Sequence, residues 1–218
     1  MREFFRRNHF LLRRLHSLTG IIPVGGFLLF HLYENSAAMV SAEAYNEVVR
    51  HINSVHLIWI AEIFAIFLPL YFHALYGIYI AMDAKHNVGN YSYGRNIAFV
   101  LQRVTGLITL VFVTVHIWQF RVQKALGAYG AHNPDSTSMS GLPSFDVLRD
   151  AFSHNWVLAL YIVGVVASVY HLCNGIYTFL ITWGITIGPK SQRISNILTN
   201  AAFVAVSALG ILTAFAFR

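Results

Sequence analysis

The chain of 218 residues is 56% hydrophobic and only 11% charged, whereas soluble domains carry roughly 25% charged residues. This composition excludes an ordinary soluble enzyme and predicts an integral membrane protein. The formal net charge of +6 does not predict a nucleic-acid partner, because the basic residues lie beside apolar stretches rather than along a stripe or groove.

Five apolar stretches follow one another along the chain. They cover approximately residues 17–39, 56–82, 97–120, 156–183 and 194–217. Each supplies the ~20 residues that are needed to cross a ~30 Å hydrocarbon core. The first is longer than the apolar part of a signal peptide, so we expect it to be retained. The predicted fold class is all-α: one integral membrane bundle of five transmembrane helices, with residues 1–218 as a single domain.

The segments between these stretches are polar. The sequence between Met39 and His56 predicts a surface helix, and the glycine- and proline-rich segment 121–155 predicts an extramembrane loop. The single cysteine, Cys173, excludes an internal disulfide and a cysteine-ligated iron–sulfur cluster within this chain.

The positive charges predict the topology. Ten of the 15 Lys and Arg residues fall on the cytoplasmic side if the N-terminus lies there: Arg2, Arg6, Arg7, Arg13, Arg14, Lys85, Arg95, Arg103, Lys190 and Arg193. Because cytoplasmic loops are enriched in basic residues, we predict a cytoplasmic N-terminus and, after five spans, a C-terminus outside.

One histidine lies well inside each of the first four spans: His31, His73, His116 and His171. A buried imidazole in a membrane needs a partner, which makes each a candidate functional residue. At ~1.5 Å rise per residue, His31 and His116 share an outer level, and His73 and His171 share an inner level. Two histidines that face each other across a bundle are usual axial ligands of a b-type haem. The sequence therefore predicts two haems b, one per pair.

A short repeat strengthens the inner pair. HALYGIY, beginning at His73, matches HLCNGIY, beginning at His171. A glycine four residues after a helical histidine lies on the same face one turn away, and its missing side chain leaves room for a flat macrocycle. The alternative is a small-residue face for helix packing.

Three further residues are candidates for binding a cofactor. His16 and Ser17 follow two arginines at the inner interface, where a haem propionate or a quinone headgroup could contact them; plain interfacial anchoring is the alternative. Glu62 precedes His73 by eleven positions, which places it about 16 Å further out, near the outer haem. A carboxylate there could exchange protons with a quinone, and the alternative is a hydrogen-bonded structural role.

Two quinone pockets are compatible with these depths. The outer pocket would be lined by some of Tyr33, Asn35, His56, Trp59, Glu62, Trp118 and Gln119, which supply aromatic walls and polar groups. The competing inner pocket would use His16, Ser17, Gln102 and Arg103.

Four segments of the chain resemble the cytochrome b subunit of Bacillus-type succinate dehydrogenase and related fumarate reductases. They are RRLHSLTGIIPVGGFLLFH, EIFAIFLPLYFHALYGIYIA, YSYGRNIAFVLQRVTGLITLVFVTVH and YHLCNGIYTFLITWGITIGPKSQRIS, which contain or begin beside the four histidines. The resemblance covers nearly the whole chain and weakens only in the first dozen residues and in the segment 127–150.

The resemblance implies a di-haem anchor in the bacterial cytoplasmic membrane, docked on its cytoplasmic side to an iron–sulfur subunit and a flavoprotein subunit. It assigns His31 and His116 to an outer, low-potential haem, and His73 and His171 to an inner, high-potential haem. The implied function is electron transfer between the iron–sulfur subunit and a membrane quinone, expected to be menaquinone. The succinate chemistry would belong to the partner chains, because this sequence has no glycine-rich dinucleotide motif after a strand.

Two alternatives remain at this point. The chain could be the cytochrome b subunit of a hydrogenase or formate dehydrogenase, whose paired histidines would look similar. It could instead be a haem-free, proton-coupled transporter that uses its buried histidines as a relay. Broken helices and inverted repeats would favour a transporter, and apart from Pro23 and Pro69 there is little sign of them.

Overall fold

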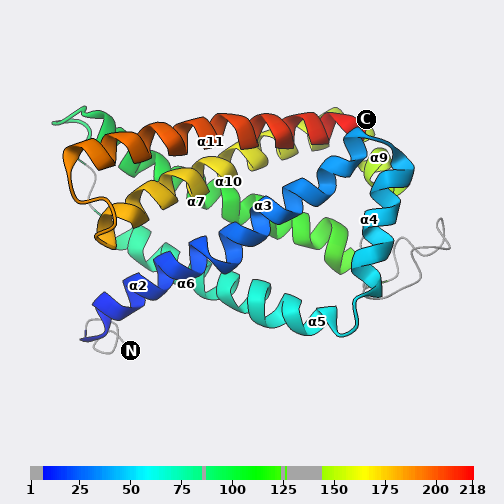
Figure 1. Ribbon diagram of the computed structural model, residues 1–218, viewed down its shortest axis with the longest axis horizontal. Helices are drawn as coiled ribbons and strands as arrows, with labels where there is room; N and C mark the ends of the chain where they lie inside the picture. Colours follow the sequence, from blue (N-terminus) through cyan, green and yellow to red (C-terminus); the bar gives the residue numbers. More distant parts are fainter. Residues whose placement is uncertain (1–6, 85–86, 124–125, 127–143) are drawn as a thin grey trace.

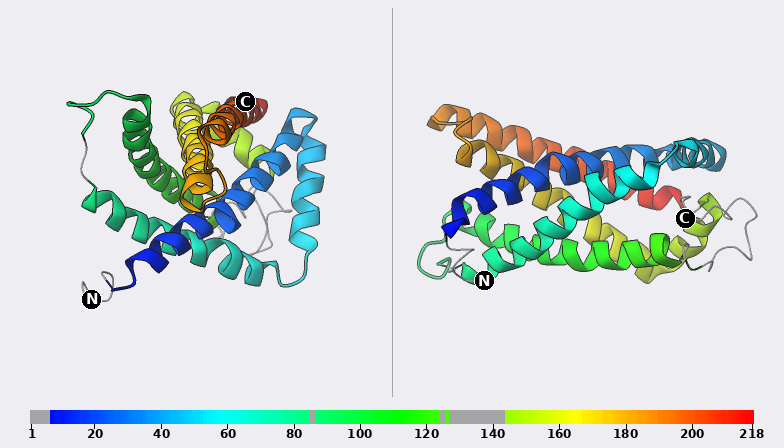
Figure 2. Two further views of the ribbon diagram at one scale, coloured as in Figure 1. Left: turned by 60° about the vertical axis from the view of Figure 1, so that its left-hand side comes forward. Right: turned by 90° about the horizontal axis from the view of Figure 1, so that it is seen from below.

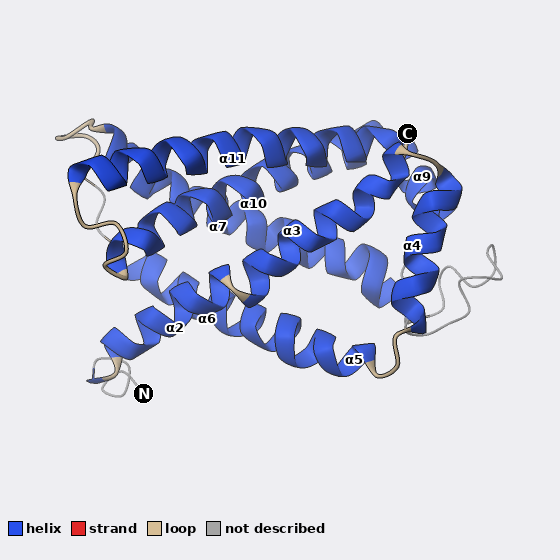
Figure 3. Cartoon of the chain, in the orientation of Figure 1, coloured by secondary structure: helices blue, strands red, loops and turns tan. Residues whose placement is uncertain are grey.

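The structure is a computed structural model that describes residues 7–84, 87–123, 126 and 144–218. Within this part of the chain all regular structure is helical, without strands (Figure 3). Five helical stretches are long and apolar enough to cross a membrane: His9–Met39, Ile58–Asp83, Gly94–Val122, Asn155–Thr182 and Pro189–Ala216. The predicted all-α fold with five candidate transmembrane helices is therefore confirmed.

The first span begins earlier than the apolar stretch from which it was predicted. It consists of α2 (His9–Ile21), α3 (Pro23–Asn35) and the short η1 (Ser36–Met39). Hydropathy marks where a helix enters the hydrocarbon, whereas the hydrogen-bonded helix continues into the polar interface. Pro23 has no N–H to donate, but Ile22 before it keeps right-handed helical angles (φ −75°, ψ −65°), so α2 and α3 follow each other directly.

Two spans contain a π-helical turn. The second consists of α5 (Ile58–Ala61), the π-helical η2 (Glu62–Phe67) and α6 (Leu68–Asp83). The third consists of α7 (Gly94–His116), which runs directly into the π-helical η3 (Ile117–Val122). Isolated π-turns are uncommon and frequently mark functional sites.

The fourth span, α10 (Asn155–Thr182), lies at the centre of the bundle (Figures 1 and 2). It packs against α7, against α11 (Pro189–Ala216) and against α2. Its Val157 and Val169 side chains are 2% and 0% exposed. A residue on α10 can therefore contact several other spans at once.

Two amphipathic helices close one end of the bundle, α4 (Ala42–Ser54) and α9 (Phe145–Ser153) (Figure 1). The Ser41 hydroxyl caps α4 by accepting a hydrogen bond from the N–H of Ala44. The predicted surface helix is thus observed. The prediction that 121–155 is a loop is wrong at both ends: residues 121–123 are still helical, and α9 buries Phe145, Leu148 and Phe152 at helical spacing. Residues 124–125 and 127–143 of that predicted loop lie outside the described residues.

An aromatic cluster joins these two helices to the C-terminus. The Phe217 ring lies 5.1 Å from Tyr45 and 5.6 Å from Phe152, measured between centroids. Burial, and after it the charge of Glu34, raises the pKa of the Tyr45 hydroxyl, which therefore stays neutral. The start of α2 lies at the opposite end, together with the end of α6, the start of α7 and the α10–α11 connection (Figure 1).

Candidate functional site

The four histidines meet in the two pairs that their depths predict. His73 on α6 and His171 on α10 have ring centroids 6.1 Å apart, with planes at 84°. His31 on α3 and His116 on α7 have centroids 5.7 Å apart, with planes at 75°. Since imidazole nitrogen binds a transition metal at about 2.0–2.1 Å, two rings on opposite sides of one ion have centroids roughly 6 Å apart. The spacing of each pair would allow its two imidazoles to hold one iron ion between them.

The inner pair is oriented by backbone carbonyl groups. Nδ1 of His73 lies 2.9 Å from the carbonyl oxygen of His16, and Nδ1 of His171 lies 2.9 Å from that of Gln102. A carbonyl oxygen can only accept, so each Nδ1 carries the proton and donates it. The lone pair is left on Nε2, which is how metal-binding histidines are usually held.

Two glycines allow these rings to reach their carbonyl groups. A Cβ on Gly20 would lie 2.2 Å from Cε1 of His73, and one on Gly106 would lie 2.9 Å from Cε1 of His171. Each glycine stands four positions after the residue whose carbonyl accepts the hydrogen bond, on the same helix face. Any larger side chain would push the ring away from its acceptor.

The glycines of the sequence repeat have different neighbours. A Cβ on Gly77 would lie 3.0 Å from the His16 ring, and one on Gly175 would have only Gln102 Nε2 near it, at 3.5 Å. The glycines that admit the His73 and His171 rings are therefore Gly20 and Gly106, which the sequence analysis did not single out.

His16 and Ser17 lie beside the inner pair. The His16 ring stacks on that of His73, with centroids 4.1 Å apart and planes at 7°. Its Nδ1 is buried and has no hydrogen-bond partner within the described part of the chain. The Ser17 hydroxyl donates to the carbonyl of Arg14 and accepts from Nε1 of Trp183 at 3.0 Å.

The outer pair is held by side chains instead. Nδ1 of His116 lies 3.1 Å from the hydroxyl of Tyr161 on α10. Asn35 donates to the backbone carbonyl of His31 at 2.7 Å, and its Nδ2 also lies 3.3 Å from Nδ1 of that ring. A substitution of Tyr161 or Asn35 would therefore remove a contact of the outer pair, whereas the backbone carbonyls that orient the inner pair would remain.

Glu62 forms an ion pair with Arg121 at 2.5 Å, joining the two π-helical turns. The two side chains are 19% and 27% exposed, so the pair is partly buried. Three aromatic residues that were predicted to line an outer pocket are exposed, namely Tyr33, Trp59 and Trp118. Gln119 accepts a hydrogen bond from Tyr161.

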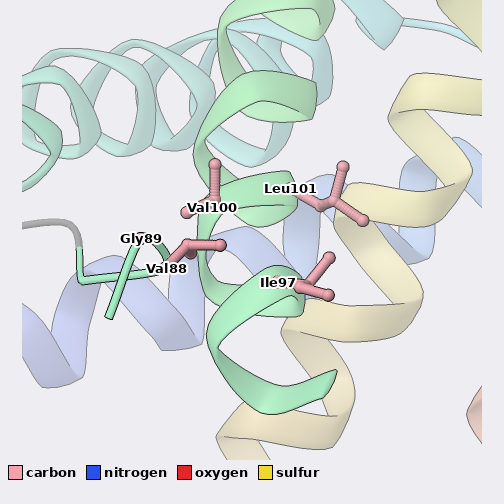
Figure 4. A pocket seen from close by; sticks show the side chains of 5 residues that line it. All are labelled: Val88, Gly89, Ile97, Val100 and Leu101. Atoms are coloured by element: carbon pink, nitrogen blue, oxygen red, sulfur yellow. The ribbon is translucent and has the colours of Figure 1, made fainter. Parts of the chain in front are cut away.

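Apolar grooves also occur in the described part of the bundle, two of them beside α7. One has a volume of about 330 Å³ and is lined by Val88, Gly89, Ile97, Val100 and Leu101 (Figure 4). The other has about 420 Å³ and lies between α7, α10 and α11. None of the four histidines lines either groove. The candidate site is therefore the pair of histidine sites inside the bundle.

The histidine pairs fit haem better than a bare metal ion. Among the described residues, no group of three or more His, Cys, Asp or Glu side chains is placed to hold a metal ion. A haem iron needs only two further ligands, because the porphyrin supplies four nitrogens. The spacing of each pair and the free Nε2 atoms of the inner pair meet that need.

Comparison with known proteins identifies the family. Residues 10–97 and 92–211 match the model of the succinate dehydrogenase/fumarate reductase transmembrane subunit. The chain belongs to this family. A relative in Bacillus subtilis (strain 168), the succinate dehydrogenase cytochrome b558 subunit, is 47% identical over 208 residues, which are 95% of this chain and 96% of the relative.

These comparisons favour the succinate dehydrogenase interpretation over a hydrogenase cytochrome or a transporter. The chain is a multi-pass membrane subunit of a succinate dehydrogenase/fumarate reductase complex and not its catalytic subunit. Membership of the family also implies partner subunits.

Sequence reasoning missed three residues of this transmembrane subunit, Gly20, Gly106 and Tyr161. A signal for the glycines was present, because residues 15–22 and 101–108 share the pattern L-x-x-x-T-G-x-I. In both copies the threonine hydroxyl donates to the carbonyl four residues earlier, at 2.8 and 2.7 Å. No comparable pattern marks Tyr161.

Proposed function

We propose that the chain is a di-haem cytochrome b anchor that transfers electrons between an iron–sulfur subunit and a membrane quinone. The observation that carries this proposal is the meeting of four histidines from four spans in two pairs, with centroids 5.7 and 6.1 Å apart. Residues 1–218 would form one domain around two haems b. His31 and His116 would ligate the outer haem, and His73 and His171 the inner one.

The protein would bind, orient and shield these groups. Bound haem b supplies one-electron transfer at its iron. The carbonyls of His16 and Gln102 hold the protons of the inner ligands on Nδ1, and Gly20 and Gly106 leave the rings in reach of those carbonyls. The apolar spans would keep bulk water away from both levels.

His16 and Ser17 would contact a propionate of the inner haem or a quinone headgroup. Two observations support this role for the inner end. Nδ1 of His16 is buried without a partner in the described structure, and Arg14 lies close by with its guanidinium 5.1 Å from the Trp183 ring. An anionic propionate oxygen or a quinone carbonyl oxygen could form hydrogen bonds with both the His16 ring and the Arg14 guanidinium.

Glu62 would serve the outer quinone site. Reduction of a quinone, here expected to be menaquinone, takes up two protons as well as two electrons, so a carboxylate is useful beside the headgroup. The Glu62 carboxylate is paired with the Arg121 guanidinium, which joins the two π-helical turns. When this pair opens, a Glu62 carboxyl oxygen would be free to accept a proton and pass it on.

The proposed orientation has a cytoplasmic N-terminus and an outer C-terminus in the bacterial cytoplasmic membrane. Within the described structure, α2, the start of α7 and the start of α11 share one end of the bundle (Figure 1). These segments carry basic residues: Arg7 just before α2, Arg13 and Arg14 on α2, Arg95 and Arg103 on α7, and Lys190 and Arg193 on α11. Arg2, Arg6 and Lys85 lie outside the described residues. We propose that this face docks the iron–sulfur subunit, with a flavoprotein subunit beyond it, and contacts anionic lipid at its edge.

The proposed function is tested by purifying the chain with its natural partners. A flavoprotein and an iron–sulfur subunit should co-purify, and succinate should reduce haem b in the complex. Co-purification with a hydrogenase or formate dehydrogenase, or haem that hydrogen or formate reduces and succinate does not, would overturn the proposal.

A further inference from the structure

We infer that Tyr161 is a positioning residue for His116 and lowers the redox potential of the outer haem through this ligand. The inference rests on the proposed function, since it assigns a role toward a haem held by His116. It concerns a residue that lies on α10, whereas His116 lies at the end of α7.

The hydrogen bonds around Tyr161 fix the tautomer of His116. The Tyr161 hydroxyl donates to Oε1 of Gln119 at 3.3 Å, so an oxygen lone pair faces Nδ1 of His116 at 3.1 Å. His116 Nδ1–H is then the donor, and its Nε2 keeps the lone pair that binds iron. Donation from Tyr161 to Gln119 also makes the hydroxyl oxygen a better acceptor, because linked hydrogen bonds polarise one another.

The Tyr161 ring is held by its aromatic neighbours. Its side chain is only 6% exposed, and its centroid lies 4.7 Å from that of Phe152 and 5.1 Å from that of Phe112. Phe112 in turn fills the space beside Gly164, where a Cβ would lie 2.2 Å from the Phe112 ring. The hydroxyl is therefore presented to His116 in one position.

This arrangement differs from that of the inner ligands. His73 and His171 donate to backbone carbonyls, which no single substitution removes, whereas His116 donates to a side-chain hydroxyl. An acceptor on Nδ1–H raises the basicity of a ligand histidine. A more basic ligand stabilises the oxidised iron and so lowers the potential. Tyr161 thus gives the chain a means of setting the outer potential separately from the inner one.

The test is Tyr161→Phe in the complete complex, with Tyr45→Phe as the matched control. Tyr45 is also a buried tyrosine at this end, but its ring packs against Phe145 and Phe217. Redox titration and low-temperature electron paramagnetic resonance would follow each haem separately. We expect Tyr161→Phe to shift the outer potential upward and alter the outer resonance, with the inner haem unchanged. Tyr45→Phe should change neither.

A second variant keeps the inference falsifiable if Tyr161→Phe loses the outer haem. Gln119→Leu leaves the tyrosine in place and removes the acceptor of its proton, so it should shift the outer potential in the same direction by a smaller amount. Unchanged potential and resonance of the outer haem in the haem-loaded variants would overturn the inference. A wild-type complex without a second haem would overturn the proposed function, and this inference with it.

Discussion

The imidazole ring of His73 occupies the space that a side chain on Gly20 would fill, since a Cβ there would lie 2.2 Å from Cε1 of the ring. Gly20→Ala should therefore displace His73 and weaken binding of the inner, higher-potential haem, with an overpacking cost of about 1–3 kcal/mol. Gly106→Ala should do the same through His171. Redox titration would show the loss of one haem.

Gly26→Ala is the matched control for this prediction. Gly26 lies on α3 in the same span, and a Cβ on it would have nothing within 4 Å. Inner-haem content and potential that stay at wild-type values in both Gly20→Ala and Gly106→Ala would contradict the proposed ligand geometry.

Glu62→Gln should slow quinone turnover and weaken inhibition by quinone analogues, because it removes the carboxylate that would exchange protons at the outer site. Glu43→Gln is the control, since Glu43 forms an exposed ion pair with Arg50 on the surface helix α4. In the Glu62→Gln complex, electron transfer to a soluble acceptor that bypasses the quinone site should remain normal. If Glu62→Gln has no effect while Ser17→Ala abolishes both properties, the quinone site lies at the inner end.

Arg121→Gln should destabilise the outer end more than Arg50→Gln does. The Glu62–Arg121 pair is partly buried, whereas Glu43 and Arg50 are 75% and 56% exposed, and exposed pairs typically contribute about 0.2–1 kcal/mol. Arg121→Gln leaves the Glu62 carboxylate without its guanidinium partner. Thermal unfolding of the purified complex would compare the variants, and equal melting temperatures for the two would refute the stabilising role of the partly buried pair.

The iron–sulfur subunit should crosslink to the N-terminal end of the bundle. In a Cys173→Ala background, a cysteine at Lys190, after the α10–α11 connection, should react with the partner through a short bifunctional reagent. A cysteine at Asp146 on α9 should not, because α9 lies at the opposite end (Figure 1). Crosslinking at Asp146 alone would reverse the proposed orientation.

Some of these features could be predicted from the sequence because they depend on local physics. A membrane span needs ~20 apolar residues, and the constant rise of a helix ranks the depths of His31 and His73 without knowledge of packing. The contacts of His73 with His16 and of His116 with Tyr161 could not be predicted. They join residues on different helices, and the rotation of each helix about its axis decides whether such residues meet.

The helix α9 escaped prediction for a related reason. It is short, it follows a glycine- and proline-rich segment, and its stability depends on burying Phe145 and Phe152 against the aromatic cluster around Phe217. Short helices have little stability of their own, so tertiary packing decides whether they form.

Haem quantification in the purified, fully loaded complex tests the central claim most directly. The account predicts two haems b per chain, falling to one in His73→Ala or His171→Ala with loss of the higher-potential component. In His31→Ala or His116→Ala the lower-potential component should be lost instead, and His51→Ala, on the surface helix α4, should keep both. One haem, or none, in the wild-type complex would contradict the assignment of the two histidine pairs.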